Sequence, residues 1–303
     1  MGATGQLILW TASTIKNCSI ISQAVWDWGS PSDHASTEVA TFISSWSTYL
    51  PAITTPASGS ADCLVQNCAV AGFPYAIQTS ANSNNRFTAR DVLIDCINGI
   101  DIEQTGDLGK LENCHAWPFV TTNADYNDAV TSDNAPGAQV RSGTAFRFGN
   151  AGVGVDWGKM TNCFSFGYSI GFFIDKTRTV TLIGCGADNK ITNTGSVGFK
   201  LSPQYEANLV ACQVAACDYG YYVDTSVVTG TYAEQYYVKF SGCSVWDTPQ
   251  AGMFVKKGVV IVEGCSFRVN GGPSSAISTY PISIHFDYDA YASYTTNNRS
   301  VIN

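Results

Sequence analysis

Nine of the eleven cysteines in this 303-residue chain end the same four-residue pattern. The pattern is an apolar residue, any residue, a small or turn-forming residue, and then Cys. It ends at Cys18, Cys68, Cys96, Cys114, Cys163, Cys185, Cys212, Cys243 and Cys265. A unit that recurs along a chain in this way predicts a solenoid, in which each repeat packs only against its neighbours.

The residue before each cysteine indicates a corner between two strands. It is Asn, Asp or Gly in every copy except Ala211, and these types adopt the left-handed backbone conformation most readily. Most cysteines are followed by a second segment that starts with Gly and alternates apolar with other residues, as in 171–175 and 220–224. Such alternation predicts a half-buried strand that begins at a turn.

The spacing of the cysteines predicts an all-β fold, a right-handed single-stranded parallel β-helix of about nine coils. Successive cysteines are 50, 28, 18, 49, 22, 27, 31 and 22 residues apart, which suits one coil each with insertions in the two long intervals. The right hand is expected because parallel crossovers overwhelmingly adopt it. Leucine-rich repeats and propellers fit poorly, since their periods are more regular. The nine cysteines are expected to point inward as free thiols.

We expect a single domain over residues 1–303, because a solenoid grows by adding coils. Its core is predicted to span about 7–286, followed by a tail at 287–303. Residues 29–60 and 118–142 are predicted to leave the coil as loops, which carry specificity or cover a face. The segment Leu7–Trp10 enters the solenoid without a preceding helix, so another domain or protein is expected to cover that end.

The amino-acid composition limits the kinds of partner that the protein is expected to bind. The net charge of −8 disfavours nucleic acid and anionic lipid. No apolar run approaches the ~20 residues that cross a bilayer, and no signal peptide stands at the start. With three His and no C-x-x-C pair, we predict no metal site and no cofactor. The aspartates 125, 128 and 133 do not have the spacing of a calcium site.

The outward positions of the second strand are the predicted functional face. Aligning its copies from the glycines gives two outward rows. The first row contains Asp101, Ala145, Phe173, Lys200, Tyr222 and Phe254. The second contains Glu103, Arg147, Asp175, Ser202, Asp224 and Lys256.

Rows that combine carboxylates, cations and aromatic rings are typical of saccharide sites, because rings stack on the apolar faces of sugars. We predict Glu103, Asp175, Asp101 and Asp224 as catalytic carboxylates, and Arg147, Phe173, Lys200 and Tyr222 as substrate-binding residues. Glu103 and Asp175, two coils apart with Arg147 between them, would be ~9–10 Å apart at the backbone, near the range of inverting glycosidases. The alternative is that these charges are solvated cross-strand pairs without catalytic function.

The corners, together with Asn162-Cys163-Phe-Ser-Phe-Gly-Tyr168 and Cys185-Gly-Ala-Asp-Asn189, resemble the pectin-lyase-like β-helix family, and within it bacteriophage tailspikes and tail fibres. The resemblance covers about 15–286. It implies a homotrimer in the virion tail, attached to other tail proteins, that binds and depolymerises a bacterial surface polysaccharide, either capsule or O-antigen. The Asn-Thr-Asp, Asp-Asp, Gly-His-Gly and Arg-Ile-Lys motifs of polygalacturonases are missing, so a pectin enzyme is not expected.

Two classes of function follow from the sequence. In the first, the protein is a polysaccharide depolymerase, either an endoglycosidase or a lyase, of which the endoglycosidase is favoured. In the second, it is a non-catalytic receptor-binding spike or adhesin that uses the same face to hold the cell.

Overall fold

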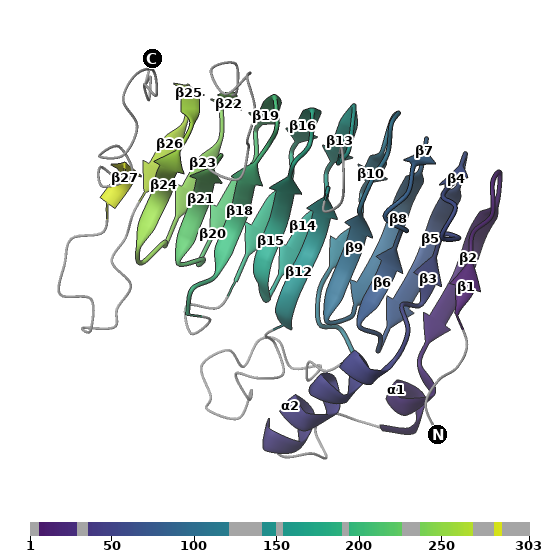
Figure 1. Ribbon diagram of the computed structural model, residues 1–303. Coiled ribbons are helices and arrows are strands. Elements are labelled where there is room, and N and C mark those ends of the chain that lie inside the picture. Colours follow the sequence, from purple (N-terminus) through teal and green to yellow (C-terminus); the bar gives the residue numbers. More distant parts are fainter. Residues whose placement is uncertain are drawn as a thin grey trace.

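The fold is a parallel β-helix, seen in a computed structural model that describes residues 6–28, 36–120, 141–149, 154–189, 194–225, 237–268 and 282–286. Strands stack as parallel rungs from the N-terminal to the C-terminal end (Figure 1). In the described residues, nine coils each contribute one strand to the first sheet and one bent strand, or a pair of strands, to the second, and β27 adds a tenth strand to the first sheet. This architecture agrees with the fold predicted from the cysteine repeat.

Ten strands form the first sheet, called sheet A here, and every pair in it is parallel. In stacking order they are β1 (Leu7–Ile8), β3 (Ile53–Thr54), β6 (Tyr75–Gln78), β9 (Asn98–Ile102), β12 (Arg141–Phe148), β15 (Tyr168–Asp175), β18 (Val197–Ser202), β21 (Tyr219–Asp224), β24 (Ala251–Lys257) and β27 (Ile282–Phe286).

The second sheet, sheet B, bends at the predicted corner. In three N-terminal coils one strand runs through the corner: β2 (Thr14–Ile21), β5 (Leu64–Ala71) and β8 (Thr88–Asp95). Later coils have one strand before it: β10 (Lys110–Glu112), β13 (Gly158–Thr161), β16 (Thr179–Ile183), β19 (Glu206–Val210), β22 (Tyr237–Ser241) and β25 (Val259–Glu263). The same coils have a second strand after the corner: β11 (His115–Ala116), β14 (Phe164–Phe166), β17 (Gly186–Asp188), β20 (Gln213–Ala215), β23 (Ser244–Trp246) and β26 (Ser266–Arg268). A small third sheet joins β4 (Ser60–Ala61) to β7 (Asn84–Asn85).

The corner residue is left-handed in all nine coils, with φ between 51° and 62°. Ala211, the poor match in the sequence, adopts this conformation too. The nine corner residues are Asn17, Asn67, Asp91, Asn113, Asn162, Gly184, Ala211, Gly242 and Gly264. The backbone turn therefore recurs even where the residue type does not favour it.

One of the nine cysteines of the repeat was wrongly aligned with the others. In the third coil Val92, not Cys96, pairs with Cys68, and the corner is Asp91. With Val92 in place, the intervals of 28 and 18 residues become 24 and 22, which is the more regular spacing that a stacked coil requires. Cys96 lies beyond the end of β8, where its buried carbonyl accepts a hydrogen bond of 2.9 Å from the Tyr168 hydroxyl.

All eleven cysteines are unpaired. Eight of them stack behind the corners, buried in the middle coils and half-buried at Cys18 and Cys265 in the end coils. The hydrogen bond with the Cys185 thiol, assisted by burial, raises the pKa of Cys212 to about 12. The Cys212 thiol therefore stays protonated at neutral pH, and the buried thiols of the stack act as small apolar side chains.

Aromatic rings form the largest continuous stack in the core. Phe146, Phe172, Phe199 and Tyr221 follow one another on the inner side of sheet A, with ring centroids 5.1, 4.5 and 5.3 Å apart. All four side chains are fully buried. Such pairs add ~0.5–1.5 kcal/mol each beyond the apolar area that they bury.

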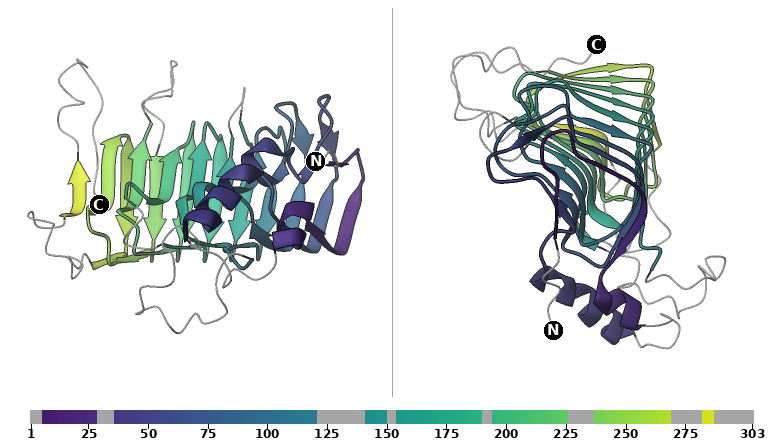
Figure 2. Two further views of the ribbon diagram at one scale, coloured as in Figure 1. Left: turned by 90° about the horizontal axis from the view of Figure 1, so that it is seen from below. Right: turned by 90° about the vertical axis from the view of Figure 1, so that its right-hand side faces the viewer.

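The segment 29–60 is not only a loop, which corrects the prediction. It contains α2 (Ser36–Ser45) and the 3-10 turn η2 (Trp46–Thr48), its residues 53–54 and 60–61 are strands of the coil, and the short helix α1 (Gln23–Trp28) precedes it. Both helices lie beside the N-terminal coils rather than across their open end (Figure 2). None of the helices in the described ranges is long and apolar enough to cross a membrane.

A buried ion pair connects these helices to the coil. The Arg141 side chain donates from Nε to Asp95 Oδ1 at 3.2 Å, and its guanidinium carbon lies 5.5 Å from the centre of the Trp46 ring. Asp95 Oδ2 accepts from the Val120 amide at 2.7 Å.

Of the predicted insertion 118–142, residues 121–140 lie outside the described residues, as does the tail 287–303.

Candidate functional site

One row of mixed side chains follows the outer face of sheet A. Strand pairing places its members in register, one from each coil. In order, they are Gln78, Asp101, Arg147, Phe173, Lys200, Tyr222 and Phe254. Five of the eight predicted site residues therefore share this row: Asp101, Arg147, Phe173, Lys200 and Tyr222.

Arg147 lies in this row rather than in the predicted second row. Ala145, not Gly143, stands opposite Gly99 of β9, so Arg147 pairs with Asp101 where the sequence alignment had placed Ala145. Ala145 itself is fully buried. The alignment from the glycines was therefore two residues out in β12, which keeps the same face of the strand but moves each outward side chain by one row.

Phe173 sits between two cations. The guanidinium carbon of Arg147 lies 4.9 Å from the centre of the ring, and the Lys200 ammonium lies 4.7 Å from it. Both distances are within the ~6 Å at which a cation is attracted to an aromatic ring. The ring is half-buried, so part of it faces solvent.

The second row contains the other three predicted carboxylates, each with a polar partner. Arg147 reaches across from the first row and binds Asp175 Oδ2 through Nη2 at 3.0 Å. Asp224 pairs with Lys256 at 3.0 Å. Glu103 Oε1 accepts a hydrogen bond of 3.1 Å from Gln78. Glu103 and Asp175 lie two coils apart, as predicted, although Arg147 approaches from a different row.

Asp101 differs most from an ordinary surface carboxylate. It is 3 % exposed, and its Oδ1 has no hydrogen-bond partner. Burial raises the pKa of Asp101 to about 7, against the opposing effect of Arg147, and the negative charges of Glu103 and Asp175 contribute to the rise. The group therefore exchanges its proton near neutral pH, as a general acid or base must.

An aromatic cluster forms the C-terminal end of the row. The rings of Tyr222 and Phe254 are stacked with centroids 5.1 Å apart, and Tyr219 meets each of them edge-on. All three side chains are half-buried. The face thus changes from charged at the N-terminal coils to aromatic at the C-terminal coils.

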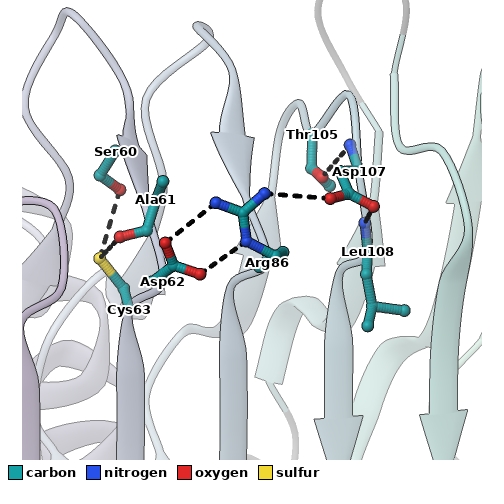
Figure 3. Close-up of polar contacts among 8 residues, drawn as sticks. All are labelled: Ser60, Ala61, Asp62, Cys63, Arg86, Thr105, Asp107 and Leu108. Carbon is teal, nitrogen blue, oxygen red and sulfur yellow. Dashed lines mark hydrogen bonds and ion pairs between the residues drawn. The ribbon is translucent and has the colours of Figure 1, made fainter.

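A second polar cluster, at the turn between the two sheets, is structural. Arg86 binds Asp62 with two hydrogen bonds of 2.6 and 2.9 Å and binds Asp107 at 3.1 Å, which links three consecutive coils (Figure 3). Its hydrogen bond lowers the pKa of Asp62. The hydrogen bond from the Leu108 amide, followed by that from Arg86, lowers the pKa of Asp107. Both carboxylates stay ionised, so this cluster has no group suited to acid or base catalysis.

Nothing among the described residues brings together three His, Cys, Asp or Glu side chains that would hold a metal ion. His115 packs edge-on against Trp117 and Phe164, and burial lowers its pKa. His34 and the three aspartates considered as calcium ligands lie outside the described residues.

Two residues of the site were missed by the sequence reasoning. Gln78 occupies the row position before Asp101, and burial followed by the charge of Asp101 raises the pKa of Tyr75. Both lie in β6, which begins after Pro74 and lacks the entry glycine that was used to find the other copies. The sequence of Tyr75–Gln78 shows no period-two alternation, so it gave no signal of its own.

Comparisons with protein-family models, with curated proteins and with solved structures found no match. The function is therefore argued from the site itself.

Proposed function

We propose that the outer face of sheet A binds a saccharide chain along the axis of the β-helix. The observation that carries this proposal is the row from Asp101 to Phe254, in which half-buried aromatic rings alternate with cations and carboxylates. Aromatic rings stack on the apolar faces of sugars, while charged groups bind their hydroxyls.

The length of the row suits an extended ligand. Asp101 and Phe254 are five coil steps apart, which corresponds to ~24 Å at the strand spacing of a β-sheet. All of these side chains project from regular strands, so their spacing is fixed by the backbone ladder. A chain of several sugar units, rather than one monosaccharide, matches this geometry.

The ligand in this proposal is a bacterial surface polysaccharide, a capsule or an O-antigen. That part rests on the resemblance of the corners to phage tailspikes, as do assembly into a homotrimer and a place in the virion tail beside other tail proteins. Light scattering of the purified protein tests the assembly. A homotrimer of the 32.4 kDa chain would have a mass near 97 kDa (3 × 32.4).

Hydrolysis of the bound chain is the second candidate function, and the titration of Asp101 near neutral pH favours it. Asp101 would act as the acid, with Asp175 or Glu103 as the second carboxyl group, because glycoside hydrolysis uses a pair of carboxyl groups. The 3 % exposure of Asp101 opposes this role, since the side chains beside it must move before a substrate reaches the carboxyl. Binding is therefore the primary proposal.

A panel of purified capsule and O-antigen polysaccharides tests the binding proposal by calorimetry. Phe173→Ala and Tyr222→Ala should each weaken binding about tenfold, because each removes a stacking ring. Trp157→Ala is the matched control, since Trp157 is 60 % exposed but lies in the turn before β13. Equal affinity in all three variants would contradict the proposal.

New reducing ends, measured after incubation with a polysaccharide that binds, test hydrolysis. Loss of a general acid lowers the rate by ~10²–10⁴-fold, so Asp101→Asn should abolish cleavage while binding remains. If the parent protein binds but releases no new ends, the adhesin function is the correct one. If Asp101→Asn cleaves normally while Asp175→Asn does not, Asp101 is not the acid.

A further inference from the structure

A shallow hollow lies on the outer side of the strands that follow the cysteine corner, on a different wall of the coil from sheet A. Its volume is about 220 Å³, and its lining comes from β14, β17, β20 and β23 with the corners before β14 and β17. The lining includes Phe164, Gly186, Asp188, Gln213, Ala215 and Trp246.

Two small residues form the floor of this hollow. Strand pairing gives one row in which Gly186 stands between Phe164 and Gln213, and a second row in which Ala215 stands between Asp188 and Trp246. Residues two coils apart are separated by ~10 Å, and the two rows by ~7 Å. The large side chains therefore surround an opening of about the size of one six-membered ring.

Aromatic rings stand at two opposite corners of the opening. The Phe164 ring leans over Gly186, where an added Cβ would lie 2.9 Å from Phe164 Cδ2, and it is held from behind by an edge-on contact with His115. Trp246 is 37 % exposed, so much of its indole faces solvent. A partly exposed indole beside a depression offers a flat apolar surface to a ligand.

Polar groups occupy the remaining two corners. The Asn189 amide donates to Asp188 Oδ1 at 2.7 Å and holds this carboxyl in place. Gln213 contributes an exposed side-chain amide on the opposite side. A mostly apolar hollow with a few fixed polar groups is the usual form of a small-ligand site, and this one is smaller than the ~300–1,000 Å³ of sites for drug-sized ligands.

We propose that this hollow binds a single pyranose unit of a saccharide, with its apolar face on Trp246 and its hydroxyls at Asp188 and Gln213. The site is separate from the outer face of sheet A and does not depend on that proposal. A quaternary ammonium ion is the other ligand that aromatic rings and a carboxylate bind. It fits less well, because Phe164 and Trp246 are three coils apart, ~14 Å at the backbone, and do not enclose one point.

Saturation-transfer NMR with the methyl pyranosides of glucose, galactose, mannose and N-acetylglucosamine tests the site. At least one should receive saturation from the protein, and Trp246→Ala should weaken its binding about tenfold. Ala215→Leu is a second variant, which fills the floor from an outward position and should remove binding while Trp246 remains. Trp26→Ala, on a residue 75 % exposed in α1, is the control and should bind as the parent does. Phe173→Ala is measured alongside and reports on sheet A.

The outcomes separate this site from the saccharide face of sheet A. Binding that is lost in Trp246→Ala and Ala215→Leu but kept in Trp26→Ala supports the hollow, whatever happens to polysaccharide binding on sheet A. Binding that is lost only in Phe173→Ala overturns the inference and leaves the sheet A proposal intact. Failure of all four pyranosides to bind also overturns it.

Discussion

The two faces of sheet A are built from alternate residues of the same strands, yet they differ completely in chemistry. The inner row is apolar in every coil, with Ile100, Phe146, Phe172, Phe199, Tyr221 and Met253 all buried. The outer row, one residue further along, changes from carboxylate to cation to aromatic ring from coil to coil. Burial restricts what the inner row accepts, so the variation that a ligand can recognise is confined to the outer row.

The largest expected effect is on the inner side. Phe172→Ala should lower the free energy of unfolding by ~3–5 kcal/mol, because it leaves a cavity in the middle of the ring stack. The neighbouring change Phe173→Ala, on the outer side, should cost less than ~1 kcal/mol, since that ring is half exposed. Chemical denaturation of both variants measures the difference. Equal losses would mean that the outer ring is as important to the core as the inner one.

Asp101 is an exception to this contrast, because it is a buried carboxyl on the outer face. Its contribution to the free energy of unfolding should depend on pH. Its pKa of about 7 in the folded protein lies above the ordinary value of 3.8, so the folded protein holds a proton that the unfolded chain releases. The free energy of unfolding should therefore fall as pH rises from about 4 to about 7, and be constant above that. Asp101→Asn should remove this loss and stabilise the protein by up to a few kcal/mol at pH 8, and by much less at pH 5.

Denaturation of the parent and of Asp101→Asn between pH 5 and pH 8 measures this dependence. Asp62→Asn is the control, because its hydrogen bond with Arg86 lowers the pKa of Asp62, so the stabilisation from its ionised form is constant between pH 5 and pH 8 and is lost only below about pH 4. A constant difference between the parent and Asp101→Asn across this range would show that Asp101 titrates normally.

The corners extend this comparison, because at these positions the backbone conformation alone determines which residue types are favourable. Ala211 is held at φ 52°, a conformation that costs a residue with a Cβ ~1–2 kcal/mol. Ala211→Gly should relieve that strain and stabilise the protein by up to ~1 kcal/mol, after the greater freedom of glycine in the unfolded chain is subtracted. Gly242→Ala should do the reverse, since its φ is 62° and an added Cβ meets nothing within 4 Å. Melting temperatures that move in the same direction in both variants would contradict this.

The smallest expected effect is on the outer row. Lys200→Met keeps the length of the side chain but removes the cation beside Phe173, and should change the free energy of unfolding by less than ~1 kcal/mol. Saccharide binding should weaken more clearly than stability does. Thermal unfolding and calorimetry of the same preparation compare the two, and a variant that loses stability but binds normally would assign Lys200 to the fold instead.

Much of the fold followed from short-range features of the chain. The corner pattern correctly predicted nine coils, and inward stacking for eight of its nine cysteines. It misplaced the third coil because Asp95-Cys96 looks like a corner, whereas the true one, Asp91-Val92, lacks the cysteine. The helix α2 within the first insertion was not predicted, because it is short and is stabilised by the burial of Phe42, Ile43 and Trp46 against the side of the coil.

The candidate site was predicted in part. The sequence named the right outward face, because alternation alone decides which residues of a strand share a side. The rows were wrong at Arg147, since only the pairing of β12 with β9 shows that Ala145, not Gly143, stands where the other strands have their entry glycine. The hollow beside Trp246 had no sequence signal, because its small floor residues Gly186 and Ala215 come from different coils.

The amino-acid sequence by itself determined the coil, its corners and the alternation of inner and outer residues, because these depend on residue types a few positions apart. Only the tertiary structure decided the register between coils, the burial that moves the pKa of Asp101 and the partners of each outer charge. Those properties arise between residues that are 20 to 50 positions apart in the chain and meet only when the coils stack. A local pattern specifies each repeat, but the contacts across repeats depend on the insertions and bulges between them.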